Sequence, residues 1–265
     1  MNVEQLFDLS GKVVIITGAA GNLGSRYADG LSQFGANVVL ADIDHAKCKQ
    51  MAKKIKEKYL TDPEPIKLDL TKKKSISNMV SKVLKKYSKI DVLINNAAYQ
   101  GNDKIRKTSF EKLSLDDWNK SIAVNLTGVF LMCQQVGKIM KKQKQGNIIN
   151  IGSTYGIVAP DQRIYGKSGQ NAASFYSATK SGVINLTRYL ASYWANSGIR
   201  VTTLSPGGVK RNKDKSFIKN YSKKTMIGRM AKQDEYVGAI VFLASDASSY
   251  MTGSNLIIDG GWTAW

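Results

Sequence analysis

The sequence predicts a single α/β domain built on a doubly wound parallel sheet of about seven strands. Short apolar runs rich in β-branched residues alternate with helical patterns along the chain. A glycine-rich turn joins the first of these runs to the first helix. No linker, internal repeat or low-complexity segment divides the 265 residues. We therefore expect one domain, 1–265, with a substantial core.

The N-terminal half supplies four of the predicted strands, at 13–16, 38–42, 66–69 and 92–98. The first of them is continuously apolar, which is typical of a strand that is buried on both faces of a parallel sheet. Amphipathic patterns between the strands predict a helix that ends near Phe34 and two further helices at about 46–59 and 75–87.

The C-terminal half begins with one long predicted helix at 118–142 that carries Asn125 in its apolar middle, where a buried amide needs hydrogen-bond partners. A fifth strand at 148–151 leads to Ser153, and a helix follows from Tyr176 to about 196. The sixth strand, 200–205, leads to Pro206. A helix at 234–244 and a strand at 256–258 complete the pattern, and the basic, weakly periodic segment 210–224 is typical of a mobile flap.

The formal net charge of +19 is the one unusual total, and it raises the possibility of a nucleic-acid partner. Only seven of the 39 basic residues are arginine, however, and the lysines are spread over several helices. Arginine forks are the favoured readers of bases and phosphates, and the sequence contains no nucleic-acid motif. The charge therefore predicts a solvated lysine surface and no nucleic-acid partner.

Cysteine and histidine are too few for a metal cluster or a disulfide framework, so we expect no metal site. Cys48 and Cys133 are predicted to be packing residues, and His45, next to Asp44 at a helix start, is predicted to carry no chemistry. No apolar run approaches the ~18 residues of a membrane span, and no signal peptide is evident. We expect a cytoplasmic protein that does not contact a membrane.

The glycine-rich turn Thr17–Gly24 stands between a strand and a helix, which is where backbone amides can approach a pyrophosphate at the positive end of the helix. Asp42 ends the next strand, 24 residues after Gly18, where a dinucleotide-binding fold places an acid on the adenosine ribose. This carboxylate would repel a 2′-phosphate by up to ~4 kcal/mol at an effective dielectric of 20. NAD is therefore favoured over NADP, although Lys47 and Lys49 could soften the preference.

Tyr176 and Lys180 are four residues apart on a predicted helix, so their side chains can share a small volume. A fixed cation favours the phenolate form of a tyrosine and moves it towards a useful range for proton transfer. Ser153 follows a probable parallel strand, where its hydroxyl could bond a carbonyl or alkoxide oxygen. Together these three residues predict an acid/base device.

Eight short motifs occur in a fixed order relative to the predicted strands: Thr17-Gly18 with Gly24, Asp69, Asn95-Asn96-Ala97-Ala98, Asn125, Ser153, Tyr176 with Lys180, Pro206-Gly207, and Thr252-Gly253 with Asp259-Gly260-Gly261. In this order and strand context, the motifs resemble those of the short-chain dehydrogenase/reductase family over about residues 9–262. The resemblance implies a Rossmann fold and hydride transfer between NAD(P) and a CH–OH group. It also implies a homotetramer or homodimer whose interfaces are the long helices that carry Trp118 and Tyr176.

The resemblance also implies a role for each matching residue. Tyr176 would be the general acid/base, and Ser153 would polarise the reacting oxygen. Lys180 would lower the Tyr176 pKa and form a hydrogen bond with the nicotinamide ribose. Asn125 would hold a water that links Lys180 to solvent. The implied cofactor contacts are Gly18, Asn22, Leu23 and Gly24 around the pyrophosphate, Asp42 and Ile43 at the adenosine ribose, Asp69 and Leu70 at the adenine, Asn96 and Ala97 along the cofactor path, and Pro206, Gly207 and Val209 near the nicotinamide amide.

Three positions depart from the family pattern. Asn22 occupies the middle glycine position of the turn, and asparagine tolerates left-handed conformations better than most residues, so the turn can survive. Ala98 stands where the family has glycine. After Pro206-Gly207 the family often has a threonine that holds the cofactor amide, and Gly208-Val209 leaves that contact in doubt.

The interval between Ser153 and Tyr176 is longer than is usual in the family, so we predict substrate loops at about 154–175 and 208–228. The loop is similar to that of dehydrogenases in bacterial surface-sugar and flagellin-glycan pathways. With the cations Arg163, Lys167, Lys210 and Arg211, it suggests a small polar substrate such as a sugar or sugar phosphate. A 3-oxoacyl-(acyl-carrier-protein) reductase and a non-enzymatic, cofactor-sensing regulator are the alternatives.

Overall fold

The computed structural model describes residues 2–210 and 214–265. Its seven strands form one sheet with the order β3-β2-β1-β4-β5-β6-β7, and each neighbouring pair is parallel. The predicted doubly wound sheet is therefore confirmed. The strands are β1 Val13–Thr17, β2 Asn37–Asp42, β3 Glu64–Lys67, β4 Val92–Asn95, β5 Gly146–Ile151, β6 Ile199–Pro206 and β7 Asn255–Ile258.

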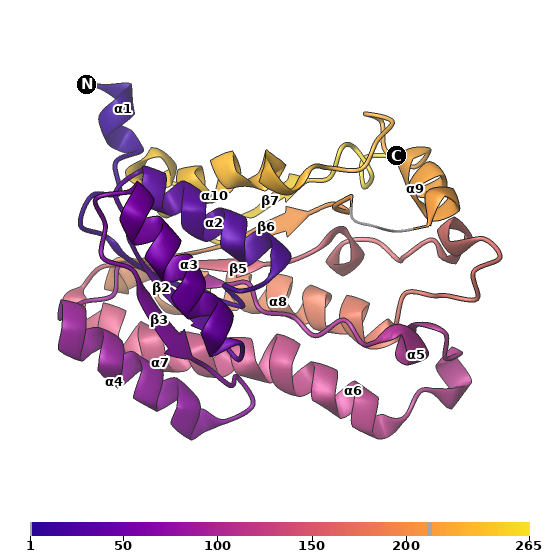
Figure 1. Cartoon of the computed structure of the whole chain (residues 1–265), viewed down its shortest axis with the longest axis horizontal. Helices are drawn as coiled ribbons and strands as arrows, with labels where there is room; N and C mark the ends of the chain where they lie inside the picture. The colour runs from indigo at the N-terminus through magenta and orange to yellow at the C-terminus, as the bar shows by residue number, and fades with distance from the viewer. Residues whose placement is uncertain (1, 211–213) are drawn as a thin grey trace.

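Two layers of helices cover the sheet (Figure 1). One face packs against α2 (Asn22–Gln33), α3 (His45–Lys58) and α10 (Val237–Ala244), and the other against α4 (Lys73–Tyr87), α7 (Gly128–Gln143) and α8 (Ser174–Tyr193). Along β1, Val13 and Ile15 belong to one apolar core, whereas Val14 and Ile16 belong to the other. A strand points successive side chains to opposite faces, so a continuously apolar strand serves both cores.

The predicted strand at 66–69 is wrong by two residues, because β3 covers Glu64–Lys67. Its register with β2 runs from Val39 opposite Glu64 to Asp42 opposite Lys67, so the pairing stops where β2 ends. β3 is the edge strand, which is where the proline at its second position is tolerated. The remaining elements agree with the predicted ones to within a few residues.

The helix predicted at 118–142 is not one regular α-helix. The structure has α6 (Leu115–Ile122), a π-helical turn over Ala123–Thr127 and then α7. Asn125 lies in the π turn, a feature that often marks a functional position. By length and composition alone this 29-residue rod could cross a membrane. The buried side chains of α7, including Met132 and Val136, pack into the core of the domain, as in a core helix of a globular protein.

Two short helices, α5 (Asp103–Arg106) and α9 (Lys215–Ser222), lie at the same end of the molecule (Figure 1). A third short helix, α1 (Val3–Leu6), lies at the N-terminus. α9 occupies the C-terminal part of the segment that was predicted to be a flap; the predicted contact Arg211 lies outside the described residues.

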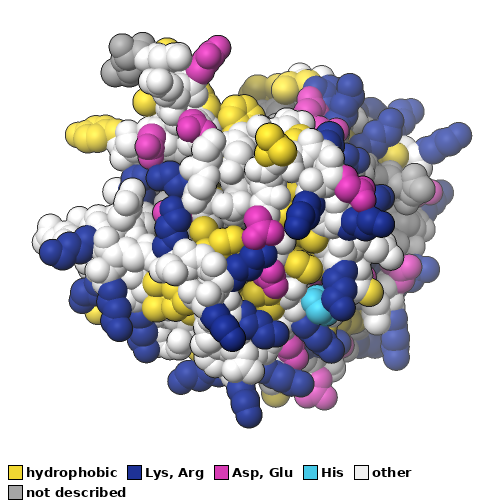
Figure 2. Space-filling view, turned by 60° about the vertical axis from the view of Figure 1, so that its left-hand side comes forward, with side chains coloured by type: hydrophobic (Ala, Val, Ile, Leu, Met, Phe, Trp, Pro, Cys, Tyr) yellow, Lys and Arg dark blue, Asp and Glu magenta, His cyan; other side chains and the backbone are white. Residues whose placement is uncertain are grey.

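Lysine and arginine side chains are scattered over the face shown in Figure 2, with acidic side chains between them. Several ion pairs in the described part of the chain have two well-exposed side chains, such as Arg26 with Asp234 and Lys53 with Glu57. Exposed pairs of this kind contribute little to stability. On this face the positive charge forms no continuous stripe, in keeping with a solvated lysine surface.

Candidate active site

A cavity of about 490 Å³ opens beyond the carboxyl ends of the central strands. Ser153 reaches it from the loop after β5, Pro206 from the end of β6, and Tyr176 from the first turn of α8. Parallel α/β sheets bind their ligands at this edge, because the turns after the strands converge there. Both predicted substrate loops, 154–175 and 208–228, contribute residues to the cavity wall.

Tyr176 and Lys180 lie one turn apart on α8, as their spacing predicts. The Lys180 Nζ lies 5.7 Å from the centre of the Tyr176 ring and donates a hydrogen bond to the Ile151 carbonyl at 2.5 Å. The Ile151 carbonyl belongs to the last residue of β5, so the sheet fixes the position of the ammonium group. Tyr176 lines the cavity, whereas Lys180 is buried behind it.

Burial lowers the pKa of Lys180 to about 8, because the protein interior disfavours the charged ammonium. Only 3% of the residue is exposed. The carbonyl of Ile151 compensates for part of the lost hydration. Near neutral pH the side chain therefore remains largely protonated, so a positive charge lies beside Tyr176.

Ser153 is buried at the cavity wall and caps the short helical turn Thr154–Gly156. Its Oγ accepts a hydrogen bond from the Tyr155 backbone N–H at 3.1 Å. With that lone pair occupied, the hydroxyl proton can be directed at another acceptor. The Ser153 hydroxyl is therefore free to donate a hydrogen bond to an oxygen atom in the cavity.

Asn125 is fully buried in the π turn, and its amide is committed to protein partners. Oδ1 accepts from the Tyr99 N–H at 2.6 Å, and Nδ2 donates to the Tyr99 carbonyl at 2.9 Å and to Ser121 Oγ at 3.0 Å. The side chain therefore anchors the segment after β4 to the helix. It is placed to support the site, and its own amide has little capacity left for the expected water.

The glycine-rich turn has the geometry that a dinucleotide requires at two of its positions. Gly18 has a φ of +66°, and a Cβ there would lie 2.7 Å from Ala97 Cα. A Cβ on Gly24 would lie 2.3 Å from the Gly18 carbonyl oxygen. Any side chain at either position would push the turn away from β4 or from α2, so glycine is needed at both.

Asn22 does not adopt the left-handed conformation that the family comparison suggested. It is the first residue of α2, after an extended Gly21, and the left-handed position of the turn is Gly18. No side chain caps the N-terminus of α2, and the buried Asn22 Nδ2 has no hydrogen-bond partner among the described residues. Unpaired donors at a helix N-terminus fit a pyrophosphate, so the amides of Asn22, Leu23 and Gly24 suit this group.

Asp42 ends β2 and points back towards the glycine-rich turn. One carboxylate oxygen accepts from the Ala20 N–H and the other from the Asp44 N–H, each at 3.0 Å. The adjacent Ile43 is 67% exposed, so an apolar surface stands open beside a fixed carboxylate. A fixed carboxylate beside an exposed apolar residue is compatible with the adenosine ribose contact expected of Asp42 and Ile43.

Asp69 and Leu70 follow β3 at the same edge of the sheet. The Thr71 hydroxyl bonded to the Asp69 carboxylate is the largest cause that lowers the pKa of this acid. Leu70 is buried in the core, where its Cβ would lie 2.9 Å from a Cβ added to Gly128. The Leu70 side chain therefore faces inwards, and only its backbone can contact an adenine.

Asn96 and Ala97 hold the glycine-rich turn against β4. Asn96 Nδ2 donates to the carbonyls of Thr17 and Gly18, and the Ala97 N–H donates to Thr17 Oγ1. On the other side, Pro206, Gly207 and Val209 line the cavity. Gly208 follows Pro206-Gly207, where the family often has a threonine. The Gly208 N–H donates to the Tyr221 hydroxyl at 2.6 Å, so this turn is anchored to α9.

The structure does not place Arg163, Lys167 or Lys210 in the cavity wall, so their predicted contact with substrate is not supported. Arg163 is paired with Asp161, and its side chain is 83% exposed. Lys167 and Lys210 are also exposed. Cationic residues in a loop beside a site need not face the site, because a charged side chain is most stable in water.

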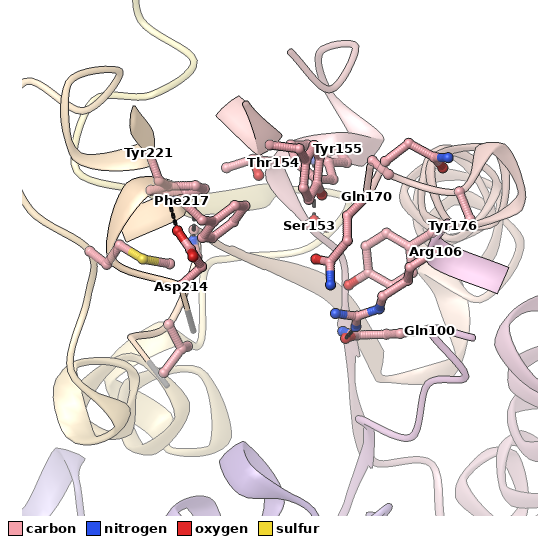
Figure 3. A pocket seen from close by; sticks show the side chains of 18 of the residues that line it. Gln100, Arg106, Ser153, Thr154, Tyr155, Gln170, Tyr176, Asp214, Phe217 and Tyr221 are labelled. Carbon is pink, nitrogen blue, oxygen red and sulfur yellow. Dashed lines mark hydrogen bonds between the residues drawn. The ribbon is translucent and has the colours of Figure 1, made fainter. Parts of the chain in front are cut away.

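Sequence reasoning missed the polar residues on one wall of the cavity. Figure 3 shows Gln100, Arg106 and Gln170 converging near Tyr176, with Asp214, Phe217 and Tyr221 across the cavity. One feature of the sequence could have indicated this wall: Asn102 is a residue type that favours the N-cap of a helix. In the structure Asn102 does cap α5, because its side chain accepts a hydrogen bond from the Ile105 N–H. Recognising that short helix would have identified Arg106 as a member of an ordered element next to the site.

Comparisons with known proteins identify a family for this chain. The family model described as enoyl-(acyl carrier protein) reductase matches residues 18–263. A post-translational flagellin modification protein A from Campylobacter coli is 31% identical and spans 96% of this chain and 99% of its own. A 3-oxoacyl-(acyl-carrier-protein) reductase from Thermotoga maritima is 36% identical (96% and 98%), and a D-threitol dehydrogenase from Mycolicibacterium smegmatis is 34% identical (99% and 97%).

Solved structures superimpose over almost the whole chain. A gluconate 5-dehydrogenase from Burkholderia cenocepacia, in complex with NADP and tartrate, has a TM-score of 0.89 at 29% identity and covers 100% of both chains. A short-chain dehydrogenase from Leptospira borgpetersenii with bound NAD+ has a TM-score of 0.85 at 34% identity and covers 99% of this chain and 96% of its own. The chain therefore belongs to the short-chain dehydrogenase/reductase family and is an oxidoreductase that acts on CH–OH groups.

Proposed function

We propose that the protein transfers a hydride between NAD(H) and a secondary alcohol or ketone on a polar, sugar-type substrate. The observation that carries this proposal is the arrangement of Tyr176, Lys180 and Ser153 at one cavity. The nicotinamide ring, when bound, supplies the hydride donor or acceptor. The backbone amides at the start of α2 and the Asp42 carboxylate would hold the cofactor. The residues that would line the rest of the cofactor site are Asn96, Ala97, Pro206, Gly207 and Val209.

The protein's own residues handle the proton and the oxygen. In the oxidative direction the Tyr176 oxygen takes the proton from the substrate hydroxyl, and in the reductive direction it returns that proton. The Lys180 charge stabilises negative charge on the Tyr176 oxygen. Ser153 donates its hydroxyl proton to the substrate oxygen and stabilises the charge that develops there. Asn125 holds the Tyr99 backbone next to these groups.

The fixed Asp42 carboxylate supports the preference for NAD over NADP. Both of its oxygens are held by backbone N–H groups, so the charge cannot easily turn away from a 2′-phosphate. Lys47 and Lys49 stand on the first turns of α3, next to this position. Their charges attract a 2′-phosphate and therefore narrow the difference between the NAD and NADP affinities.

The polar cavity wall supports a sugar-type substrate. Gln100, Arg106, Gln170 and Asp214 all line it, and hydroxyl groups pair well with such side chains. The similarity to a D-threitol dehydrogenase and to a gluconate 5-dehydrogenase points in the same direction. The similarity to a 3-oxoacyl-(acyl-carrier-protein) reductase supports the second candidate, the reduction of a 3-oxoacyl thioester.

We also propose a cytoplasmic homotetramer or homodimer whose contacts are made by the long helices. α8 exposes Tyr189 and Tyr193, which stack on each other with ring centres 5.9 Å apart, and α7 exposes Phe130. Exposed aromatic groups of this kind are typical of protein interfaces. Light scattering coupled to size-exclusion chromatography would measure the mass, and a monomer at micromolar concentration would contradict this proposal.

The test of the function is nicotinamide absorbance with NAD or NADP across polyols, sugars, sugar acids, sugar phosphates and 3-oxoacyl thioesters. We expect NAD-dependent turnover of one polar class. Tyr176→Phe should lower that turnover by at least ~10²-fold while NAD still binds, because the change removes the proton-transfer group. Tyr250→Phe, at a fully exposed tyrosine, is the matched control. Near-normal turnover by Tyr176→Phe would refute the mechanism.

A further inference from the structure

We propose that Arg106, with Gln100 and Gln170, forms a subsite for a negatively charged oxygen group on a polyhydroxylated substrate. The group would be a carboxylate or a phosphate, since both present several acceptor oxygens to a guanidinium fork. This inference deepens the proposed function and rests on it. It makes Arg106 a specificity-determining residue for the sugar-type substrate.

Arg106 is the one basic residue among the described residues that line the cavity. Its Nη2 donates to Gln100 Oε1 at 3.1 Å, and its guanidinium points into the same space as the Tyr176 ring and the Gln170 side chain (Figure 3). The positive charge also acts on Tyr165, where it works against the burial that raises the pKa of that phenol. The guanidinium therefore faces the cavity from the side that carries the acid/base residues.

No carboxylate in the described part of the chain forms an ion pair with Arg106. Arg163 and Arg229 differ, since each has a carboxylate within 2.9 Å, from Asp161 and Glu235 respectively. Gln100 is neutral and accepts only one of the guanidinium's hydrogen bonds. Arg106 thus brings an uncompensated charge and spare donors to the cavity wall, and an anionic ligand would satisfy both.

The backbone around this side chain is held in place from two directions. The Asn171 N–H donates to the Arg106 carbonyl at 2.7 Å, and Asn171 Nδ2 donates to the Thr108 carbonyl at 2.8 Å. Gln162 closes the loop that presents Gln170, because its amide both donates to and accepts from the Ala172 backbone. A guanidinium on a fixed backbone can select a ligand at low entropic cost.

The opposite wall determines where the anion can lie. Asp214 caps α9 with Oδ1 and faces Arg106 across the cavity (Figure 3). Its charge would repel an anionic group and would accept hydrogen bonds from hydroxyls. Asp103 also lines the cavity, but it is exposed at the start of α5. A substrate with its anion at Arg106 and its hydroxyls towards Asp214 satisfies both walls.

The experiment compares an open-chain sugar acid and a sugar phosphate with the neutral polyol of the same chain length. We expect the wild-type enzyme to favour one of the anionic compounds in kcat/KM, and R106Q to lower the ratio of anionic to neutral kcat/KM by roughly 10- to 100-fold, as for the loss of a charge-assisted hydrogen bond. The KM for NAD should stay within about twofold. R163Q, at an exposed arginine of the neighbouring loop, should leave the ratio unchanged.

Calorimetric titration of the NADH-loaded protein with the same compounds separates this proposal from the proposed function. Binding of the sugar acid or the sugar phosphate that R106Q abolishes supports the subsite even where no turnover occurs, and the two arms identify carboxylate or phosphate. Turnover of neutral polyols with an unchanged ratio in R106Q overturns the subsite and leaves the proposed function intact. Equal losses for anionic and neutral compounds in R106Q also overturn it, since they show a structural role. Absence of both binding and turnover overturns both proposals.

Discussion

The buried Lys180 ammonium makes a strong prediction about stability against pH. Lowering its pKa from the ordinary 10.5 to about 8 corresponds to about 3 kcal/mol, since each pKa unit is worth about 1.4 kcal/mol. The folded state bears this cost below pH 8, where the ammonium must stay charged in the interior. Between pH 8 and about 10.5 the unfolded chain binds the proton that the folded chain has lost, so this group makes stability rise with pH.

Lys180→Met removes the titrating group and keeps an unbranched side chain of similar length. At pH 7 the variant is relieved of the cost of the buried charge but leaves the buried Ile151 carbonyl without its partner, so we expect the two proteins to differ little in stability there. We also expect the wild type to gain roughly 2 kcal/mol on the variant between pH 8 and pH 10, because its penalty fades there. The variant should lose most of its turnover, since it lacks the cation beside Tyr176.

The assay is urea unfolding at pH 7, 8, 9 and 10, with the free energies of the two proteins compared at each pH. The comparison cancels groups that titrate alike in both proteins. Lys54→Met, on the exposed face of α3, controls for the loss of one positive charge from a protein of formal charge +19, and its curve should run parallel to that of the wild type. Parallel curves for Lys180→Met would refute the reasoning, because they would show that the ammonium is not desolvated in the free enzyme.

Two further substitutions test the support of the site and the choice of cofactor. Asn125→Ala should lower the free energy of unfolding by roughly 3 kcal/mol, because it removes a buried amide and leaves the part-buried N–H and carbonyl of Tyr99 without their partners. A change below about 1 kcal/mol in urea unfolding would contradict this. Asp42→Asn keeps one acceptor oxygen and removes the charge, so the ratio of NAD to NADP affinity should fall roughly tenfold or more. Titration of both cofactors measures that ratio, and an unchanged value would show that Asp42 does not face the ribose.

The parts of the site that depend on local spacing were predictable. Tyr176 and Lys180 share a helix face because of the helical period, and the glycine-rich turn follows β1 because the strand and the helix have their own patterns. The register of β3 was not predictable in the same way. Its end is decided by where β2 stops pairing, and a partner strand is not visible in a strand's own residues.

The substrate wall shows the same limit more clearly. Charge alone suggested Arg163 as a substrate contact, but the fold pairs it with Asp161 in solvent. Arg106 lies more than 100 residues before the loop 208–228 in the sequence, yet α5 and α9 face the same cavity. Which arginine faces the cavity depends on how the loops pack, and that packing involves residues from several distant segments.

The sequence by itself determined the parallel α/β sheet, the acid/base pair on α8 and the glycine-rich turn, because each arises from residues that are near neighbours along the chain. Only the tertiary structure decided that Asn125 lies in a π turn and spends its amide on Tyr99, that Asn22 is helical, and that Arg106 reaches the cavity. These features depend on hydrogen bonds and packing between segments that are distant in the chain. Such contacts form only when the whole domain has folded.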